Sequence, residues 1–331
     1  MKTTLHLRQK GLSLVELLIA LTLSLLLMAG VLQIVLSSKQ TYSSNAALFR
    51  VQESGRFAMN FITYDIRNAG YKGDCLTPPN NLLDETSSAY NPELFDLSQG
   101  INGWNDASPS WVSNRTSGDV LTVKHAANGS NATATGNTPS NANTVALNQA
   151  SLIPEDTIVI IADGQGCDVF QKRNSASASS LTRGNTGTPG NKNPGSSDLS
   201  HAYGLSMQVL TLESATYYIG NGANGQPSLR RISYQTGAAN DQELVEGIQD
   251  MQILYGIADL NKQVGSYVTA NNVTNWDNVA AVRINLLAVS ADTNVVPENQ
   301  VIAFNGANVT IANRRLAHTF STTIGIRNRL P

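Results

Sequence analysis

The longest apolar run of the chain lies close to its N-terminus. A short basic leader ends at Gly11, and residues 12–36 are then mostly apolar, with Glu16 as the only charged residue between Lys10 and Lys39. A run of about 25 such residues is ample for a membrane helix, since roughly 20 residues at about 1.5 Å each cross the hydrocarbon core of a bilayer. The pattern therefore predicts one membrane-spanning helix that carries a single carboxylate near its beginning.

Past Lys39 the apolar positions recur at spacings of three, four or seven, which is typical of one face of a helix. Gly70 and then Pro78-Pro79 end this pattern. The sequence therefore predicts one near-continuous helix from Leu12 to Asn68, about 85 Å long at the standard rise. The apolar face of its second half consists of Leu48, Val51, Ala58, Phe61, Ile62, Ile66 and Ala69.

The rest of the chain predicts β-structure. Seven segments are enriched in β-branched and aromatic residues, as strands are. Between them, residues 128–148 and 173–200 are dominated by Asn, Ser, Thr and Gly, which predicts mobile surface loops: a solvated insertion, or alternatively a recognition surface. The predicted strands are 119–124, 157–162, 208–218, 229–234, 251–257, 280–289 and 318–327.

A carboxylate inside a membrane helix needs a partner. Insertion scales assign about +2.5 to +3.5 kcal/mol to Asp and the basic residues at a helix centre. If the chain is cut after Gly11, Leu12 carries a free α-amino group and Glu16 becomes the fifth residue of the mature chain. The cationic N-terminus of a neighbouring subunit can then neutralise Glu16. The alternative is an uncut signal anchor whose Glu16 lies near the membrane interface.

The segment from Lys10 to Ala20 resembles the class III signal of type IV pilins and type II secretion pseudopilins. It combines a basic leader, a Gly, a Glu at the fifth position after that Gly and a long apolar run. The resemblance implies that a prepilin peptidase cuts after Gly11 and methylates Leu12, and that Glu16 aids docking into a filament. Leu12 departs from the usual Phe or Met. An ordinary secretory signal would lose its apolar core on cleavage.

A second resemblance, to PilW-type minor pilins, lies mainly in the C-terminal third. It is carried by residues 244–256, 279–286 and 322–328, together with 67–71, and it extends to the J-type minor pseudopilin of type II secretion. It implies an α+β fold in which a long N-terminal helix packs on an antiparallel β-rich head.

The two resemblances and the charge pattern predict the domain organisation. Basic residues precede the apolar run, so the positive-inside rule keeps the N-terminus cytoplasmic and places the head in the bacterial periplasm. We expect a cleaved leader (1–11), a transmembrane or filament-core half of the helix (12–38), an amphipathic half (39–70) and a periplasmic β-rich pilin head (71–331).

Composition supports this compartment. Charged residues make up 14% of the chain, and the net charge of −2 gives no hint of a nucleic-acid-binding surface. The two cysteines, Cys75 and Cys167, are predicted to form a disulfide in an oxidising periplasm, and the alternative is two separate buried thiols. Neither lies in a C-x-x-C pair.

The sequence predicts no catalytic, cofactor or metal site. Residues 220–225 match G-x-G-x-x-G, but Pro227 and a strand follow where a dinucleotide site needs a helix, so we predict a hairpin loop. The four histidines show no ligand spacing, and no G-x-S-x-G elbow or Walker lysine is present.

The resemblances imply a minor pilin that takes part in initiation and assembly of a type IV pilus, at or near its tip. The expected partners are other minor pilins, the major pilin, the prepilin peptidase, the inner-membrane assembly platform and a tip adhesin. We expect the stems of other minor pilins to pair with the Leu48 to Ile66 face. Two alternatives stay open: a minor pseudopilin of type II secretion, and a membrane-anchored periplasmic enzyme or binding protein.

Overall fold

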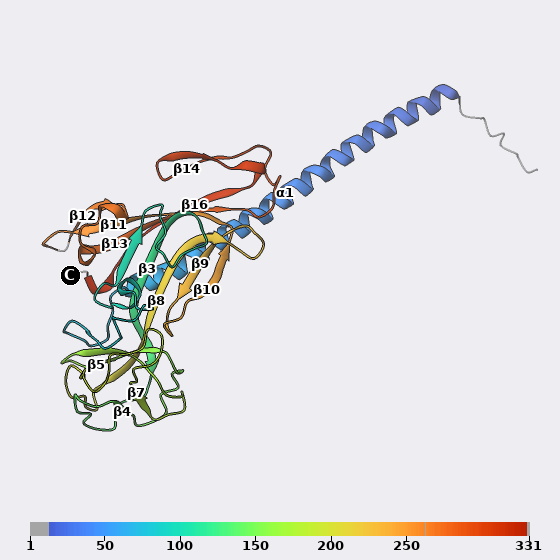
Figure 1. Cartoon of the computed structure of the whole chain (residues 1–331). Helices are drawn as coiled ribbons and strands as arrows, with labels where there is room; N and C mark the ends of the chain where they lie inside the picture. The colour runs from blue at the N-terminus through green and yellow to red at the C-terminus, as the bar shows by residue number, and fades with distance from the viewer. Residues whose placement is uncertain (1–12, 262, 330–331) are drawn as a thin grey trace, which may run out of the picture.

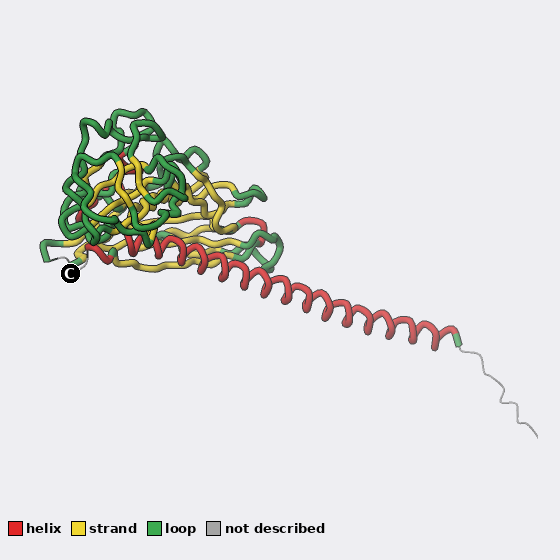
Figure 2. Tube along the Cα trace, turned by 90° about the horizontal axis from the view of Figure 1, so that it is seen from below, coloured by secondary structure: helices red, strands yellow, loops and turns green. Residues whose placement is uncertain are grey.

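A computed structural model describes residues 13–261 and 263–329, and it shows one long helix attached to a β-rich head. Helix α1 (Leu14–Asn68) leaves the head as a free stem, which Figure 1 shows in blue and Figure 2 in red. Among the described residues, it is the one helix that is long and apolar enough to cross a membrane. The predicted α+β fold is confirmed.

The two halves of α1 differ in burial. Every residue from Ser13 to Tyr42 is exposed. From Ala47 onward one residue or two in every turn are buried, because apolar and small residues recur with the helical period and face the head. These buried residues are Ala47, Val51, Gly55, Ala58, Ile62, Asp65 and Ile66.

The head contains two principal sheets whose pairings are antiparallel, apart from the short β1–β6 ladder. The larger sheet has the order β1-β6-β5-β8-β3-β2, and β9 pairs with both β8 and β10. Its strands are β1 (Asn80–Asn81), β2 (Ile101–Trp104), β3 (Arg115–Ser130), β5 (Ile158–Ala162), β6 (Cys167–Gln171), β8 (Gln208–Asn221), β9 (Pro227–Ser233) and β10 (Asn240–Glu246).

The smaller sheet has the order β12-β11-β13-β16, and α1 packs across it and against β3 and β10 of the larger sheet. Its strands are β11 (Ile248–Ala258), β12 (Val264–Val268), β13 (Val279–Val289) and β16 (Ala317–Gly325). Two small ladders stand apart from these sheets: β4 (Thr144–Ala146) pairs with β7 (Ser180–Thr182), and β14 (Val301–Phe304) pairs with β15 (Ala307–Thr310). The remaining elements are the short helix α2 (Pro92–Phe95) and the 3₁₀ turns η1 (Ala270–Asn272), η2 (Trp276–Asn278), η3 (Ala312–Arg314) and η4 (Arg327–Arg329).

The seven predicted strands are confirmed as β3, β5, β8, β9, β11, β13 and β16. The hairpin predicted at residues 220–225 is also confirmed, because β8 and β9 pair antiparallel out to Asn221 and Pro227. Gly225 takes a φ of 71° in this turn, a conformation that favours glycine.

The segments 128–148 and 173–200 are largely irregular, as predicted, but the prediction that they are solvated insertions is wrong. Both segments contribute to a lobe, residues 131–207, that has its own apolar core and the β4–β7 ladder (Figure 1). The core is built from single apolar residues and short i, i+2 pairs that lie far apart in the sequence. Those of the two loop segments are Ala132, Ala134, Val145, Leu147, Leu181 and Leu199.

Candidate docking stem and its attachment

The stem begins with a capping box. The Ser13 N–H donates to Glu16 Oε2 at 2.9 Å, and the Glu16 N–H donates to Ser13 Oγ at 3.2 Å. This S-x-x-E pattern satisfies two of the N–H groups that a helix start leaves unpaired. The spacing Ser13-x-x-Glu16 could have revealed it from sequence. Gly11 and Leu12, the predicted cleavage and methylation residues, lie outside the described residues.

The exposed stem is apolar, and one of its polar side chains is bonded within the helix. Thr22 Oγ1 donates to the carbonyl oxygens of Ile19 at 2.9 Å and Leu18 at 3.1 Å. Such bonds remove the cost of an unpaired hydroxyl in hydrocarbon. The Thr22 hydroxyl is therefore suited to an apolar environment.

A loop of the head, residues 290–300, clamps the point where the stem leaves. Gln40 Nε2 donates to the Val295 carbonyl at 3.0 Å, and Ser44 Oγ donates to the same oxygen. Arg50 forms an exposed ion pair with Asp292 at 2.9 Å, which contributes little by itself. The clamp marks the end of the free stem.

The inner face of the second half is buried against the head. Phe320 of β16 covers Gly55, and a Cβ built on Gly55 would lie only 2.1 Å from its ring. The prediction that the Leu48 to Ile66 face pairs with other stems is therefore wrong, because Val51, Ala58 and Ile62 of that face are already covered.

The outer face of the same half carries a row of exposed aromatic side chains. Phe49, Phe57, Phe61 and Tyr64 keep 45–69% of their surface accessible. Phe61 was expected on the inner face and is half-exposed instead. We call these four residues the aromatic row, and it extends the exposed apolar surface of the stem along the head.

A buried polar network fixes the end of α1 to the larger sheet. Asp65 accepts a hydrogen bond from the Tyr217 hydroxyl at 2.6 Å and faces His125 Nε2 at 3.3 Å. Arg231 lies 3.7 Å from Asp65 and also pairs with Glu213. His125 Nδ1 faces the Ala126 carbonyl at 3.0 Å, so both ring nitrogens meet acceptors. Only the imidazolium form can donate to both.

The network shifts the pKa values of its members in opposite directions. Burial alone would lower the pKa of His125, but the bonds to Asp65 and Ala126 outweigh it and raise that pKa above 6.5. Burial would raise the pKa of Asp65, but bonds from His125 and Tyr217 and the charge of Arg231 lower it below 3.8.

We expect His125→Gln to destabilise the full chain more at about pH 6 than at about pH 9, by about 1–3 kcal/mol at the lower pH. A raised histidine pKa gives stability that is complete below about pH 6.5 and is lost as the pH rises through the raised value. The Asp65 contribution is complete above about pH 3.8 and is lost as the pH falls through its lowered pKa. Denaturant unfolding in detergent measures the difference.

His318→Gln provides the matched control, because His318 is exposed and its replacement should change stability little. Burial raises the pKa of Asp119 to about 6, so Asp119 stabilises the folded chain increasingly as the pH falls. Asp119 is present in every variant, so its contribution cancels when the variants are compared with the wild-type chain. A pH-independent effect of His125→Gln would contradict the ionic network.

The far end of α1 is held by close backbone contact. The Gly70 N–H donates to the Lys124 carbonyl at 2.8 Å, and the Lys124 N–H donates to the Gly100 carbonyl at 2.8 Å. A Cβ built on Gly100 would lie 2.3 Å from the Gly70 nitrogen. Only glycine at position 100 lets the helix end approach this closely.

The structure joins Cys75 and Cys167 in a disulfide across a sequence separation of 92, with their Cα atoms 5.3 Å apart. It ties the segment after α1 to β6 at the base of the lobe. On the chain-entropy model such a loop contributes about 4–5 kcal/mol, and bridges often deliver less.

We expect protein made in an oxidising compartment to show no free thiol by alkylation and mass measurement until it is denatured and reduced. Cys75→Ser should then expose one reactive thiol, at Cys167, on denaturation alone. Two alkylated cysteines in denatured wild-type protein without reductant would rule the bridge out.

A polar cluster in the lobe has the residue types of a hydrolytic triad. Ser200 Oγ lies 3.0 Å from His201 Nδ1, and His201 Nε2 lies 2.9 Å from Asp163. However, the Ser200 hydroxyl donates a hydrogen bond to the buried carboxylate of Asp168 at 2.8 Å. The same carboxylate also accepts a hydrogen bond from the Tyr203 hydroxyl at 2.6 Å. The proton that a general base would remove is therefore held by Asp168. We assign the cluster to fixing residues 200–203 of the lobe to Asp168 of β6.

Two family models match the chain. Residues 6–32 match the prokaryotic N-terminal methylation motif, which includes Gly11, Leu12 and Glu16. Residues 216–328 match type IV pilus-assembly protein W, a range that contains the whole smaller sheet and the β9–β10 pair. The comparisons with curated proteins and with solved structures gave no match. The chain is thus similar to type IV pilus-assembly protein W over residues 216–328 and to prepilin-like proteins over its N-terminal methylation motif.

Proposed function

We propose that this chain is a minor pilin that enters a type IV pilus in few copies, at or near its tip, and takes part in initiating assembly. The observation that supports this most is the division of α1. Its apolar first half is bare and long enough to cross a membrane, and its second half is held by the PilW domain and its neighbouring strands.

The N-terminus supplies the route into the filament. In our proposal the leader is cut after Gly11, Leu12 is methylated, and the stem crosses the bacterial inner membrane with the head in the periplasm. Glu16 then meets the α-amino group of a neighbouring stem, which offsets the cost of a carboxylate in the membrane. The platform that assembles the pilus extracts the stem into the growing filament.

The aromatic row is the surface that we assign to other stems. It is accessible on the same helix as the exposed stem, whereas the inner face of α1 is occupied by the head. Aromatic side chains bury large areas when helices pack. The partners proposed for it are other minor pilins and the major pilin.

The size of the head supports a position at the tip. A head of about 260 residues has a radius of gyration of roughly 18 Å. Stems in a filament core pack about 8–10 Å apart. A shaft built only from this chain would crowd such heads around close stems, whereas one flank is free at a tip.

Quantitative mass spectrometry of sheared pili tests the proposal. Wild-type chain should be present far below the principal pilin, and Glu16→Ala should remain in the membrane at normal amounts but be depleted from pili. Thr22→Ala, which changes a polar stem residue outside the capping box, is the control and should enter pili normally. Abundance close to that of the principal pilin would show that this chain forms the shaft. Normal incorporation of Glu16→Ala would contradict the docking role.

A further inference from the structure

The edge strands of the two principal sheets differ in their protection against pairing. Edge strand β10 carries Asp241, Glu243 and Glu246 and has an irregular register. Edge strand β12 has five residues and also an irregular register. Charges, bulges and short length are the usual means of blocking an edge.

Edge strand β16 has none of these protections. It has nine residues, contains no Asp, Glu, Lys or Arg, and pairs with β13 without a bulge from Val289–Ala317 to Ala281–Gly325. It is the long, regular and uncharged edge of the two principal sheets.

The backbone of β16 directs free hydrogen-bonding groups outward. The Leu316 carbonyl accepts from the Ser290 N–H at 2.7 Å, and the Ile326 N–H donates to the Ala280 carbonyl at 2.9 Å. The backbone N–H and C=O groups of the even-numbered residues therefore point toward β13, and those of the odd-numbered residues point away from it. The Ala317 N–H is bonded by the Gln300 side chain at 2.7 Å.

The next three outward residues of β16 are Thr319, Ser321 and Thr323. Within residues 13–261 and 263–329, no group bonds their backbone N–H or C=O. Three consecutive free donor and acceptor pairs are what an added strand requires.

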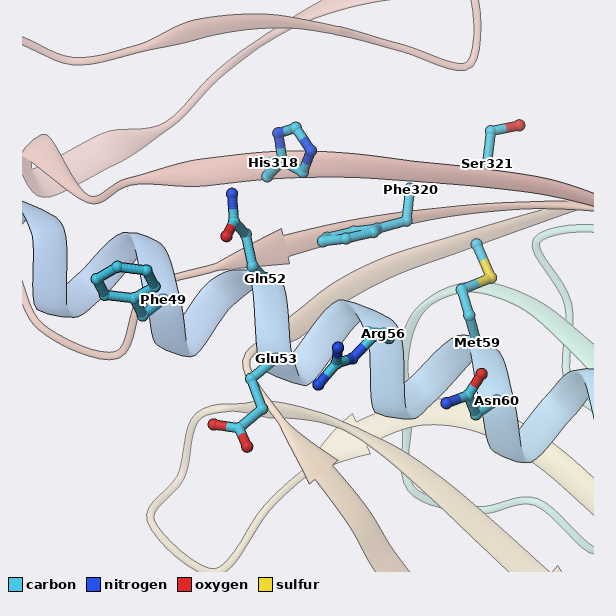
Figure 3. Close-up of a pocket in the computed structure, with 9 residues that line it drawn as sticks. All are labelled: Phe49, Gln52, Glu53, Arg56, Met59, Asn60, His318, Phe320 and Ser321. Atoms are coloured by element: carbon cyan, nitrogen blue, oxygen red, sulfur yellow. The ribbon is translucent and has the colours of Figure 1, made fainter.

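A groove lies beside this edge, between β16 and α1. Figure 3 shows side chains from both elements around it, and its volume is about 670 Å³. Phe49, Met59 and Phe320 supply apolar surface, and Glu53 and Arg56 place one charge of each sign on its helix wall. A groove without net charge suits a neutral peptide better than a polyanion or an anionic lipid surface.

The direction of β16 argues against a second copy of this chain as the partner. Phe320 lies on Gly55, and further along Asn328 Nδ2 donates to the Ala69 carbonyl at 3.3 Å, so β16 and α1 run in the same direction. Antiparallel pairing of two β16 edges would point the two stems in opposite directions. Two stems anchored in one membrane cannot adopt this arrangement.

We propose that β16 is a strand-pairing site for a different subunit of the same pilus. An uncharged extended segment of that subunit adds a fifth strand to the smaller sheet and places alternate side chains in the groove. This inference rests on the proposed function. In a pilus, the stem of a neighbouring pilin runs in the same direction as α1, and this places the head of that neighbour beside the β16 edge.

Site-specific photo-crosslinking of the full chain in pilus-forming cells tests the partner. A photoreactive residue at Ser321 should give a covalent product with another pilin-type protein, identified by peptides that include its own methylated N-terminus. The same residue at Gln242, exposed on the charged edge β10, is the control and should give little of that product. A product of two copies of this chain, or equal yields at Ser321 and Gln242, would overturn the proposal.

A proline variant tests whether the contact uses the backbone. Thr323→Pro removes an outward N–H without removing a bond to β13, and it should lower the Ser321 crosslink at least about tenfold, or about 1.4 kcal/mol. Thr323→Ala loses the same side-chain hydroxyl, which accepts from Arg283 at 3.3 Å, but keeps the N–H and should crosslink normally. Thr319→Pro replaces Thr323→Pro if that variant fails to fold.

The N-terminus, analysed in the same cells, separates this inference from the proposed function. The edge pairing alone would be overturned if the chain is processed and enters pili, but Thr323→Pro and Thr323→Ala give the same yield of the Ser321 crosslink. A retained leader on wild-type chain would overturn the proposed function.

Discussion

Gly11→Phe is expected to leave the leader attached and to exclude the chain from pili. In our proposal, a bulky residue before the cut blocks the peptidase, so Leu12 would not gain a free amine. The basic residues Lys2, Arg8 and Lys10 then stay joined to the stem. Drawing these cations into an apolar filament core would cost about 2.5–3.5 kcal/mol for each residue on insertion scales, which is enough to prevent incorporation.

Mass spectrometry of the N-terminal peptide, from membranes and from sheared pili, measures this outcome. Leu12→Phe is the matched control, because Phe is usual at this position in prepilins and should be cut and methylated normally. Recovery of a mature N-terminus at Leu12 from the Gly11→Phe chain, or of pili that contain the intact leader, would contradict the prediction.

The second large effect is expected at the other end of α1. Gly100→Ala should lower the stability of the full chain by about 3 kcal/mol, which corresponds to roughly 6–12 °C in Tm. The added Cβ would meet the Gly70 nitrogen and Cα at 2.3 and 2.5 Å, which are backbone atoms that cannot rotate away. The helix end and strand β2 must separate, and the bonds through Lys124 weaken.

Gly136→Ala is the control for a glycine replacement in the head. A Cβ built on Gly136 meets nothing within 4 Å, so the change should be neutral or slightly stabilising through its effect on the unfolded chain. Thermal unfolding of both variants in detergent is the measurement. Equal Tm values would show that the Gly70–Gly100 approach is not a constraint.

The principal elements could be predicted from sequence where burial is periodic. The face of α1 repeats with the helical period, and strands such as β11 and β13 are rich in the β-branched and aromatic residues that favour strands. Strand β10 was missed because acidic and amide residues fill its sequence, and it forms through pairing with β9. The lobe was missed because composition alone suggested solvated loops, whereas a few distant apolar residues are sufficient to build its core.

The attachment network could not be predicted, because its members are distant in the chain. Asp65 is 60 residues from His125 and 152 from Tyr217, and no local spacing relates them. One signal was present: Asp65 occupies a buried position of the helical pattern, where a carboxylate needs partners. Sequence could indicate that partners exist but not which residues they are.

The burial of α1 against β16 also has a consequence for synthesis. Helix α1 (Leu14–Asn68) is made long before β16, the strand that covers Gly55. In the export that we propose, the inner face of α1 stays uncovered until β16 has also crossed the membrane. Exposed apolar surface on such intermediates promotes aggregation. The order of elements along the chain thus makes a periplasmic chaperone, or early contact with another subunit, advantageous during maturation.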